Sequence, residues 1–174
     1  MENGEPTIKT LDAHKREILG KINNVYFSLG DEQRDVNIPE YLDKYKNLKG
    51  KKVLMVDDIA GLICAFAPSL MVATDGNMSF IFTENQSSGE LMTAIIKANP
   101  DVVLLDYNLA RGVFFGSDIA ELLKANGYTG KIIGFSTEKI ANERFDKIGI
   151  KTIEKDGVNP AESVKKVAEI YSSI

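Results

Sequence analysis

The sequence predicts an α/β fold, a doubly wound five-stranded parallel sheet preceded by a helical N-terminal extension. Three observations support this prediction. From residue 51 onward, short apolar runs alternate with longer helix-like segments. The run Val53–Val56 is continuously apolar, as expected for a strand buried on both faces. Turn and capping signals separate the segments. Such alternation is typical of a parallel sheet covered by helices on both faces.

Each element of the sheet region follows from its own stretch of sequence. The predicted strands are residues 53–57, 79–83, 102–106, 131–135 and 150–154. The predicted helices are residues 59–73, 87–98, 116–126, 138–148 and 160–172. Asn99 and Pro100 end the second of these helices. Asn159 caps the last one, and Pro160 occupies its first position.

The first 50 residues follow a different pattern and are predicted to form a separate extension, with the sheet domain covering 51–174. Three- and four-residue steps predict one amphipathic helix over residues 7–29, with a stripe made of Ile8, Leu11, His14, Ile18, Ile22, Val25 and Leu29. Residues 31–39 are expected to form a loop, and residues 39–48 a short second helix that begins at Pro39.

Composition and charge exclude several classes of function. The net charge of −4 gives no reason to expect nucleic-acid binding through a basic face. The single cysteine, Cys64, excludes an internal disulfide and a thiolate zinc cluster, and the single histidine, His14, excludes a multi-histidine metal site. The N-terminus does not resemble a signal peptide. The longest charge-free apolar stretch, 59–74, is too short for a membrane span. We therefore expect a cytoplasmic protein.

Polar side chains follow four of the predicted strands at their carboxyl ends. The set consists of Asp57 and Asp58 after the first strand, Asp106 after the third, Ser136 and Thr137 after the fourth, and Lys155 after the fifth. Open α/β sheets bind ligands at this edge. Adjacent carboxylates repel each other and resist desolvation, so a hard divalent cation such as Mg²⁺ would explain their presence. For Asp106 taken alone, a turn or capping role remains an equal alternative.

With these residues in view, residues 51–174 resemble a two-component response-regulator receiver domain, the doubly wound domain of the chemotaxis protein CheY. The order and approximate spacing of the acidic pair, Asp106, Ser136 and Lys155 carry the resemblance. It implies a flavodoxin-like sheet. It also implies that Asp106 accepts a phosphoryl group from a histidine kinase or a phosphotransfer protein, forming an acyl phosphate.

The resemblance also implies roles for the neighbouring groups. Asp58, Asp106 and the backbone carbonyl of Asn108 would bind Mg²⁺ directly, and Asp57 would bind it through water. Lys155 would supply further positive charge to the transferring group. Ser136 would hydrogen-bond a phosphoryl oxygen and draw in the end of its strand.

Two further positions would modulate the lifetime of the phosphoryl group. Asn108 and Glu138 would flank the path of the attacking water, as in chemotaxis receivers with short-lived signals. The alternative, that both are ordinary polar loop residues, is equally open.

Three departures from the family pattern affect these expectations. Asp156 follows Lys155 where a proline is usual, so the bend after the fifth strand must form differently. Thr152 occupies the position of the switch aromatic, which suggests another output surface. Thr137 stands where a smaller residue is usual and would narrow access for the phosphodonor.

The favoured function is a stand-alone response regulator that signals by binding a downstream protein, since no effector domain follows residue 174. It would catalyse only its own phosphorylation and dephosphorylation. The alternative is a degenerate, phosphate-independent receiver that acts as an interaction or dimerisation module. A haloacid dehalogenase-type hydrolase is rejected because Asn108 stands where that class needs a second aspartate, and because the short predicted loops leave no room for a substrate cap.

The uncharged helix at 59–73 contains Pro68 and has an apolar outer face that needs a cover. We expect residues 7–29 to cover it, within the chain or across a homodimer; an external partner for the N-terminal helix is the alternative. His14 lies on the apolar stripe of that helix. It is therefore predicted to be a core or interface residue, not a phosphodonor.

Overall fold

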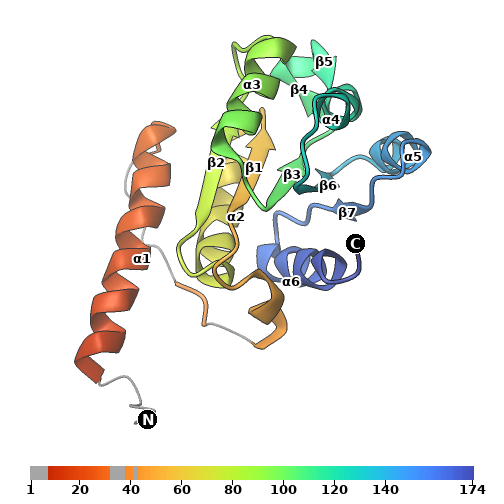
Figure 1. The fold of residues 1–174 in the computed structure, drawn as a ribbon. Coiled ribbons are helices and arrows are strands. Elements are labelled where there is room, and N and C mark those ends of the chain that lie inside the picture. Colours follow the sequence, from red (N-terminus) through yellow and green to blue (C-terminus); the bar gives the residue numbers. More distant parts are fainter. Residues whose placement is uncertain (1–7, 32–37, 41–42) are drawn as a thin grey trace.

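A five-stranded parallel sheet forms the centre of the structure (Figure 1). This computed structural model describes residues 8–31, 38–40 and 43–174. The strands are β1 (Val53–Asp57), β2 (Met78–Phe82), β3 (Val102–Leu105), β6 (Lys131–Ser136) and β7 (Thr152–Glu154). They lie in the order β2-β1-β3-β6-β7, with every neighbouring pair parallel. The predicted fold class is confirmed.

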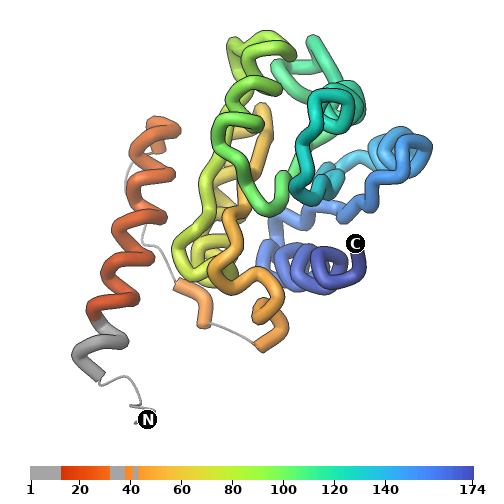
Figure 2. Tube along the Cα trace, viewed as in Figure 1, coloured from red at the N-terminus to blue at the C-terminus, as the bar shows by residue number. Residues whose placement is uncertain are grey.

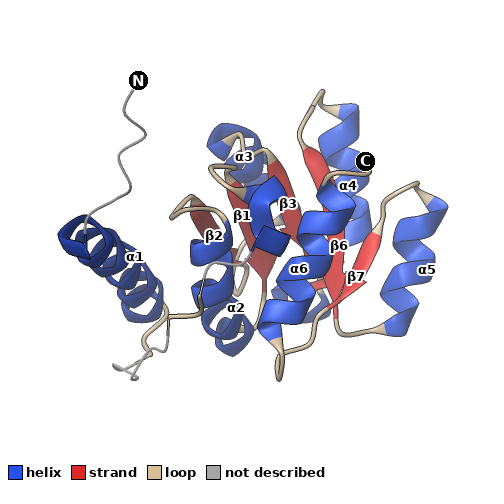
Figure 3. Ribbon diagram, turned by 90° about the horizontal axis from the view of Figure 1, so that it is seen from below, coloured by secondary structure: helices blue, strands red, loops and turns tan. Residues whose placement is uncertain are grey.

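Helices flank the sheet on both faces (Figure 3). They are α2 (Ala60–Ala73), α3 (Ser88–Ala98), α4 (Gly116–Ala125), α5 (Lys139–Lys147) and α6 (Pro160–Tyr171). All five begin and end close to the predicted positions. Their apolar residues form two cores, one between the sheet and α2 and α6, the other between the sheet and α3, α4 and α5.

Strand β1 shows why the apolar runs are continuous. Val53 and Met55 belong to the core beneath α2 and α6, whereas Leu54 and Val56 belong to the core on the opposite face. Successive side chains of a strand point to opposite faces, so a strand covered on both sides needs apolar residues at every position.

Helix α1 (Ile8–Ser28) packs on α2 within the chain and runs along the side of the domain where α2 lies (Figure 2). Ile18, Ile22 and Val25 are buried in the same core as the side chains of α2. The expected cover for the apolar helix is therefore confirmed as an in-chain contact. Residue 7 and the side chains of Ile8 and Leu11 lie outside the described residues. Exchange of α1 between two copies would bury the same surface and stays a prediction.

The second N-terminal helix differs from the prediction. It is a 3₁₀-helix, η1 (Asp43–Leu48), and Pro39 and Glu40 are not helical, so the predicted start at Pro39 is wrong. Proline is also common outside helices, and Ile38 beside it packs against the core. Most of the predicted loop at 31–39, namely 32–37, lies outside the described residues, as do 41–42.

A small hairpin follows β3 and was not predicted. Strands β4 (Asn108–Leu109) and β5 (Phe114–Phe115) pair antiparallel across a 3₁₀ turn, η2 (Ala110–Gly112). Two-residue strands are too short to show any hydrophobic period. The described helices include none with both the length and the apolarity that a membrane span requires.

Candidate functional site

The aligned register of the parallel strands brings the predicted polar residues to one edge of the sheet. Val56 pairs with Leu105, so Asp57 and Asp106 follow at neighbouring positions. The Asp106 N–H donates to the Val56 carbonyl oxygen at 3.0 Å, which fixes the two strand ends together. The backbone N–H of Lys155 donates to the Ser136 carbonyl oxygen at 3.0 Å, which places the Lys155 backbone beside the end of β6.

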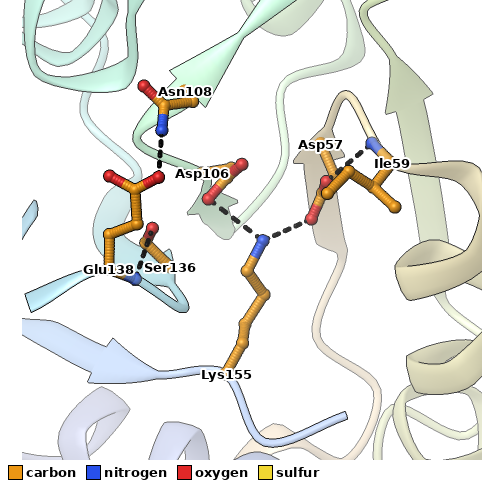
Figure 4. Close-up of polar contacts among 7 residues, drawn as sticks. All are labelled: Asp57, Ile59, Asp106, Asn108, Ser136, Glu138 and Lys155. Carbon is orange, nitrogen blue, oxygen red and sulfur yellow. Dashed lines mark hydrogen bonds and ion pairs between the residues drawn. The ribbon is translucent and has the colours of Figure 1, made fainter. Parts of the chain in front are cut away.

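The Lys155 side chain lies between two buried carboxylates (Figure 4). Its Nζ is 2.5 Å from Asp57 Oδ2 and 3.0 Å from Asp106 Oδ1. The Lys155 side chain is 1% exposed, so its ammonium group contacts the two carboxylates in place of water. The predicted convergence of Lys155 with both aspartates is confirmed.

Burial also changes the acidity of both carboxyl groups. Loss of solvent raises the pKa of Asp106 to about 6, and the Asp57 charge adds to the rise, while the Lys155 ammonium opposes it. Burial likewise raises the pKa of Asp57, against the lowering effect of Lys155. The single positive charge of Lys155 therefore does not fully offset the cost of burying the two carboxylate charges of Asp57 and Asp106. A bound cation would relieve this imbalance.

Asp58 completes the acidic cluster. It is half-buried, and its Oδ2 accepts a hydrogen bond of 2.9 Å from the Arg111 N–H. Asp57, Asp58 and Asp106 each place one carboxylate oxygen within 4.8 Å of the others. Three converging carboxylate oxygens are the ligand type that Mg²⁺ prefers, so these residues fit the predicted metal.

Three other predicted residues surround Asp106 on the side away from Asp57 (Figure 4). Ser136 is buried at the end of β6, and its Oγ accepts the Glu138 N–H at 3.3 Å. The Asn108 side-chain amide donates to Glu138 Oε1 at 2.5 Å. Asn108 and Glu138 are therefore joined to each other beside the site. Thr137, between Ser136 and Glu138, is exposed.

The missing proline after Lys155 is replaced by an aspartate turn. Asp156 Oδ1 accepts the N–H groups of Val158 at 2.9 Å and Asn159 at 3.1 Å. Its own N–H donates to Ser163 Oγ at 3.0 Å. The Asp156 side chain thus bends the backbone toward α6, as aspartate does in Asx turns. Its carboxylate accepts hydrogen bonds from these backbone N–H groups. Strand β7 (Thr152–Glu154) itself carries no aromatic residue.

Several residues of the site were not predicted. Thr83, at the end of the predicted second strand, is fully buried, and its Oγ1 accepts the Ala110 N–H at 3.2 Å. Gly116 donates its N–H to the Tyr107 carbonyl at 2.7 Å, and a Cβ there would collide with the Asp106 carbonyl oxygen. The strand-end rule that selected the other residues would also have selected Thr83. Nothing in the sequence marks Gly116.

His14 lies away from this edge, on α1. Its Nε2 lies 2.7 Å from Oδ1 of Asp75, in the turn after α2. The histidine side chain is 49% exposed, so it is not a core residue; it lies where α1 contacts the turn after α2. An acidic residue beside the end of α2 offers a polar partner that the apolar stripe did not reveal.

The sequence matches no protein-family model and no curated protein. Solved receiver domains nevertheless share its fold. The BeF3-activated DrrB receiver domain superposes with a TM-score of 0.53 at 15% identity, over 71% of this chain and 98% of that one. A CheY-like response-regulator receiver domain from Methylobacillus flagellatus gives 0.54 at 18% identity, over 70% and 98%.

A third structure shows the same relation. A LuxR-family two-component response regulator from Aurantimonas sp. SI85-9A1 has a TM-score of 0.55 at 16% identity, over 72% of this chain and 87% of that chain. The strand order, the flanking helices and these superpositions agree, and the chain therefore has the CheY-like fold of response-regulator receiver domains.

Proposed function

We propose that this chain is a response regulator that accepts a phosphoryl group on Asp106 from a histidine kinase or a phosphotransfer protein, with Mg²⁺ as cofactor. The observation that supports it best is the buried Lys155, which contacts both Asp57 and Asp106 at the strand edge of a receiver fold. Buried charges arranged in this way are unfavourable for stability alone and are typical of functional sites.

The chemistry follows from the arrangement of the charges. An ionised Asp106 oxygen attacks the phosphorus of the phosphohistidine; a P–O bond forms, the P–N bond breaks, and the electron pair stays on the imidazole nitrogen. The Lys155 ammonium, 3.0 Å from Asp106, is close enough to offset charge on the transferring oxygens. Mg²⁺, held directly by Asp58, Asp106 and the Asn108 carbonyl and through water by Asp57, would supply further positive charge to the same oxygens.

Two neighbouring contacts would act after the phosphoryl group has been transferred. Ser136 Oγ, at the end of β6, would donate to a phosphoryl oxygen and shift that strand end. The Asn108–Glu138 hydrogen bond lies beside Asp106 and would control the approach of water, and hence the lifetime of the acyl phosphate. The signal would leave by binding a downstream protein, through a surface other than the one that Thr152 occupies.

Mass spectrometry after incubation with Mg²⁺ and acetyl phosphate tests this proposal directly. We expect a gain of one phosphoryl group that is absent from Asp106→Asn. Because acyl phosphates hydrolyse, a beryllofluoride titration with and without Mg²⁺ should accompany it. No phosphoryl gain together with no metal-dependent beryllofluoride binding would contradict the proposal. Such a result would favour the phosphate-independent binding module.

A further inference from the structure

A segment with left-handed backbone lies beside the acidic site, between β4 and β5. Its three residues have positive φ angles: 49° at Ala110, 57° at Arg111 and 80° at Gly112. Glycine adopts this conformation readily, but alanine and arginine do so only where surrounding contacts hold them. Two such residues in a row therefore indicate a segment that its neighbours keep in place.

The residues that hold it follow β2 directly. The buried Thr83 accepts the Ala110 N–H through its Oγ1 at 3.2 Å. The Glu84 carboxylate forms an ion pair with the Arg111 guanidinium, through Oε1 and Nη2. The Arg111 side chain is otherwise open to solvent, with 74% of its area exposed, and Glu84 is its ion-pair partner among the described residues.

The held segment determines where Asp58 points. Lys155 pairs with both Asp57 and Asp106, whereas the ion pairs of the described residues include none between Lys155 and Asp58. Within the described part of the chain, Asp58 accepts one hydrogen bond, from the Arg111 N–H to Oδ2. The orientation of the third carboxylate thus depends on the conformation of Arg111.

We propose that the Glu84–Arg111 ion pair is a positioning pair for the divalent-cation site. It holds the Arg111 backbone so that its N–H aligns the Asp58 carboxylate with those of Asp57 and Asp106. This inference rests on the proposed function, because it assumes that the acidic edge binds Mg²⁺. Glu84 is not one of the carboxylates that converge within 4.8 Å, so its role is indirect.

The direction in which Mg²⁺ affinity changes on removal of Arg111 or Glu84 distinguishes a positioning role from a purely electrostatic effect of their charges. If only charge mattered, removal of the Arg111 cation would tighten Mg²⁺ binding, and removal of the Glu84 anion would weaken it. If the pair positions Asp58, removal of either residue weakens binding. Outer partners of metal ligands typically contribute about tenfold or more to metal affinity, which is the loss expected for each variant.

The test is a Mg²⁺ titration of the full chain followed by ¹⁵N–¹H NMR. It compares the wild type with Arg111→Gln, Glu84→Gln, the double variant and Arg111→Lys. Glutamine and lysine face the same left-handed backbone cost as arginine, so these changes isolate the guanidinium. Arg144→Gln is the matched control, since it removes one exposed arginine on α5 that forms no ion pair with the described residues. Hydrogen exchange of the backbone amide at position 111 reports the Asp58 hydrogen bond in the same samples.

The expected result has four parts. Both single variants bind Mg²⁺ about tenfold more weakly, the double variant is no weaker than either, Arg111→Lys recovers part of the affinity, and Arg144→Gln binds as the wild type does. The backbone amide at position 111 would exchange faster in the weakened variants than in the wild type. Tighter or unchanged binding by Arg111→Gln would overturn the positioning role while leaving the proposed function intact. Absence of Mg²⁺ binding by the wild type would overturn both.

Discussion

Replacing Asp106 by asparagine should stabilise the protein at pH 8, although it removes the proposed phosphoryl acceptor. Burial raises the pKa of Asp106 from 3.8 to about 6, despite the opposing Lys155 charge. One pKa unit of difference between the folded and unfolded states corresponds to about 1.4 kcal/mol. The ionised carboxylate therefore costs the folded state about 3 kcal/mol at pH 8.

The pH dependence follows from the direction of this change. Because the folded pKa lies above the unfolded value, the protonated folded form is favoured, and no stability is lost below about pH 4. Stability then falls as the pH rises through the folded pKa of about 6. Asparagine does not titrate, so its advantage should grow from about 1 kcal/mol at pH 4.5 to about 3 kcal/mol at pH 8.

Urea unfolding followed by circular dichroism, in metal-free buffer at pH 4.5, 6 and 8, measures this difference. Glu121→Gln serves as the control, since it neutralises an exposed carboxylate on α4 that makes no ion pair with the described residues. The reasoning is refuted if Asp106→Asn is no more stable than the wild type at pH 8, or if its advantage does not increase with pH.

Three further changes test other parts of the structure. Lys155→Met leaves two buried carboxylates without their cation and should lower the unfolding free energy at pH 8 by about 3–5 kcal/mol; a smaller loss at pH 4.5, where the acids protonate, would support this cause. Ile22→Ala should cost about 2–4 kcal/mol in urea unfolding because this α1 side chain is fully buried against α2; a loss below about 0.5 kcal/mol would mean that α1 is not docked in solution. Gly116→Ala should abolish phosphoryl gain in mass spectrometry and lower the melting temperature, since its Cβ would displace the Asp106 backbone; unchanged phosphorylation would contradict the close approach.

Much of this protein was predictable from sequence because the relevant signals are local. A strand buried on both faces must be apolar at every position, so central runs such as 53–56 and 102–105 could be located directly. Parallel strands then share one carboxyl edge, which is why Asp57, Asp106 and Lys155 could be assigned to one site before any distance was known. The uncharged helix at 60–73 likewise required a cover, and α1 supplies it.

Other features were decided only by the tertiary structure. The left-handed backbone of Ala110 and Arg111 is unfavourable for those residue types and exists because Thr83 and Glu84, which directly follow β2, hold it. The orientation of Asp58 depends in turn on that backbone. Burial of Asp106 at the strand edge, which no local pattern measures, raises the pKa of its carboxyl group. Residue types and their order thus identified the site, whereas contacts between distant segments fixed its geometry and its charge balance.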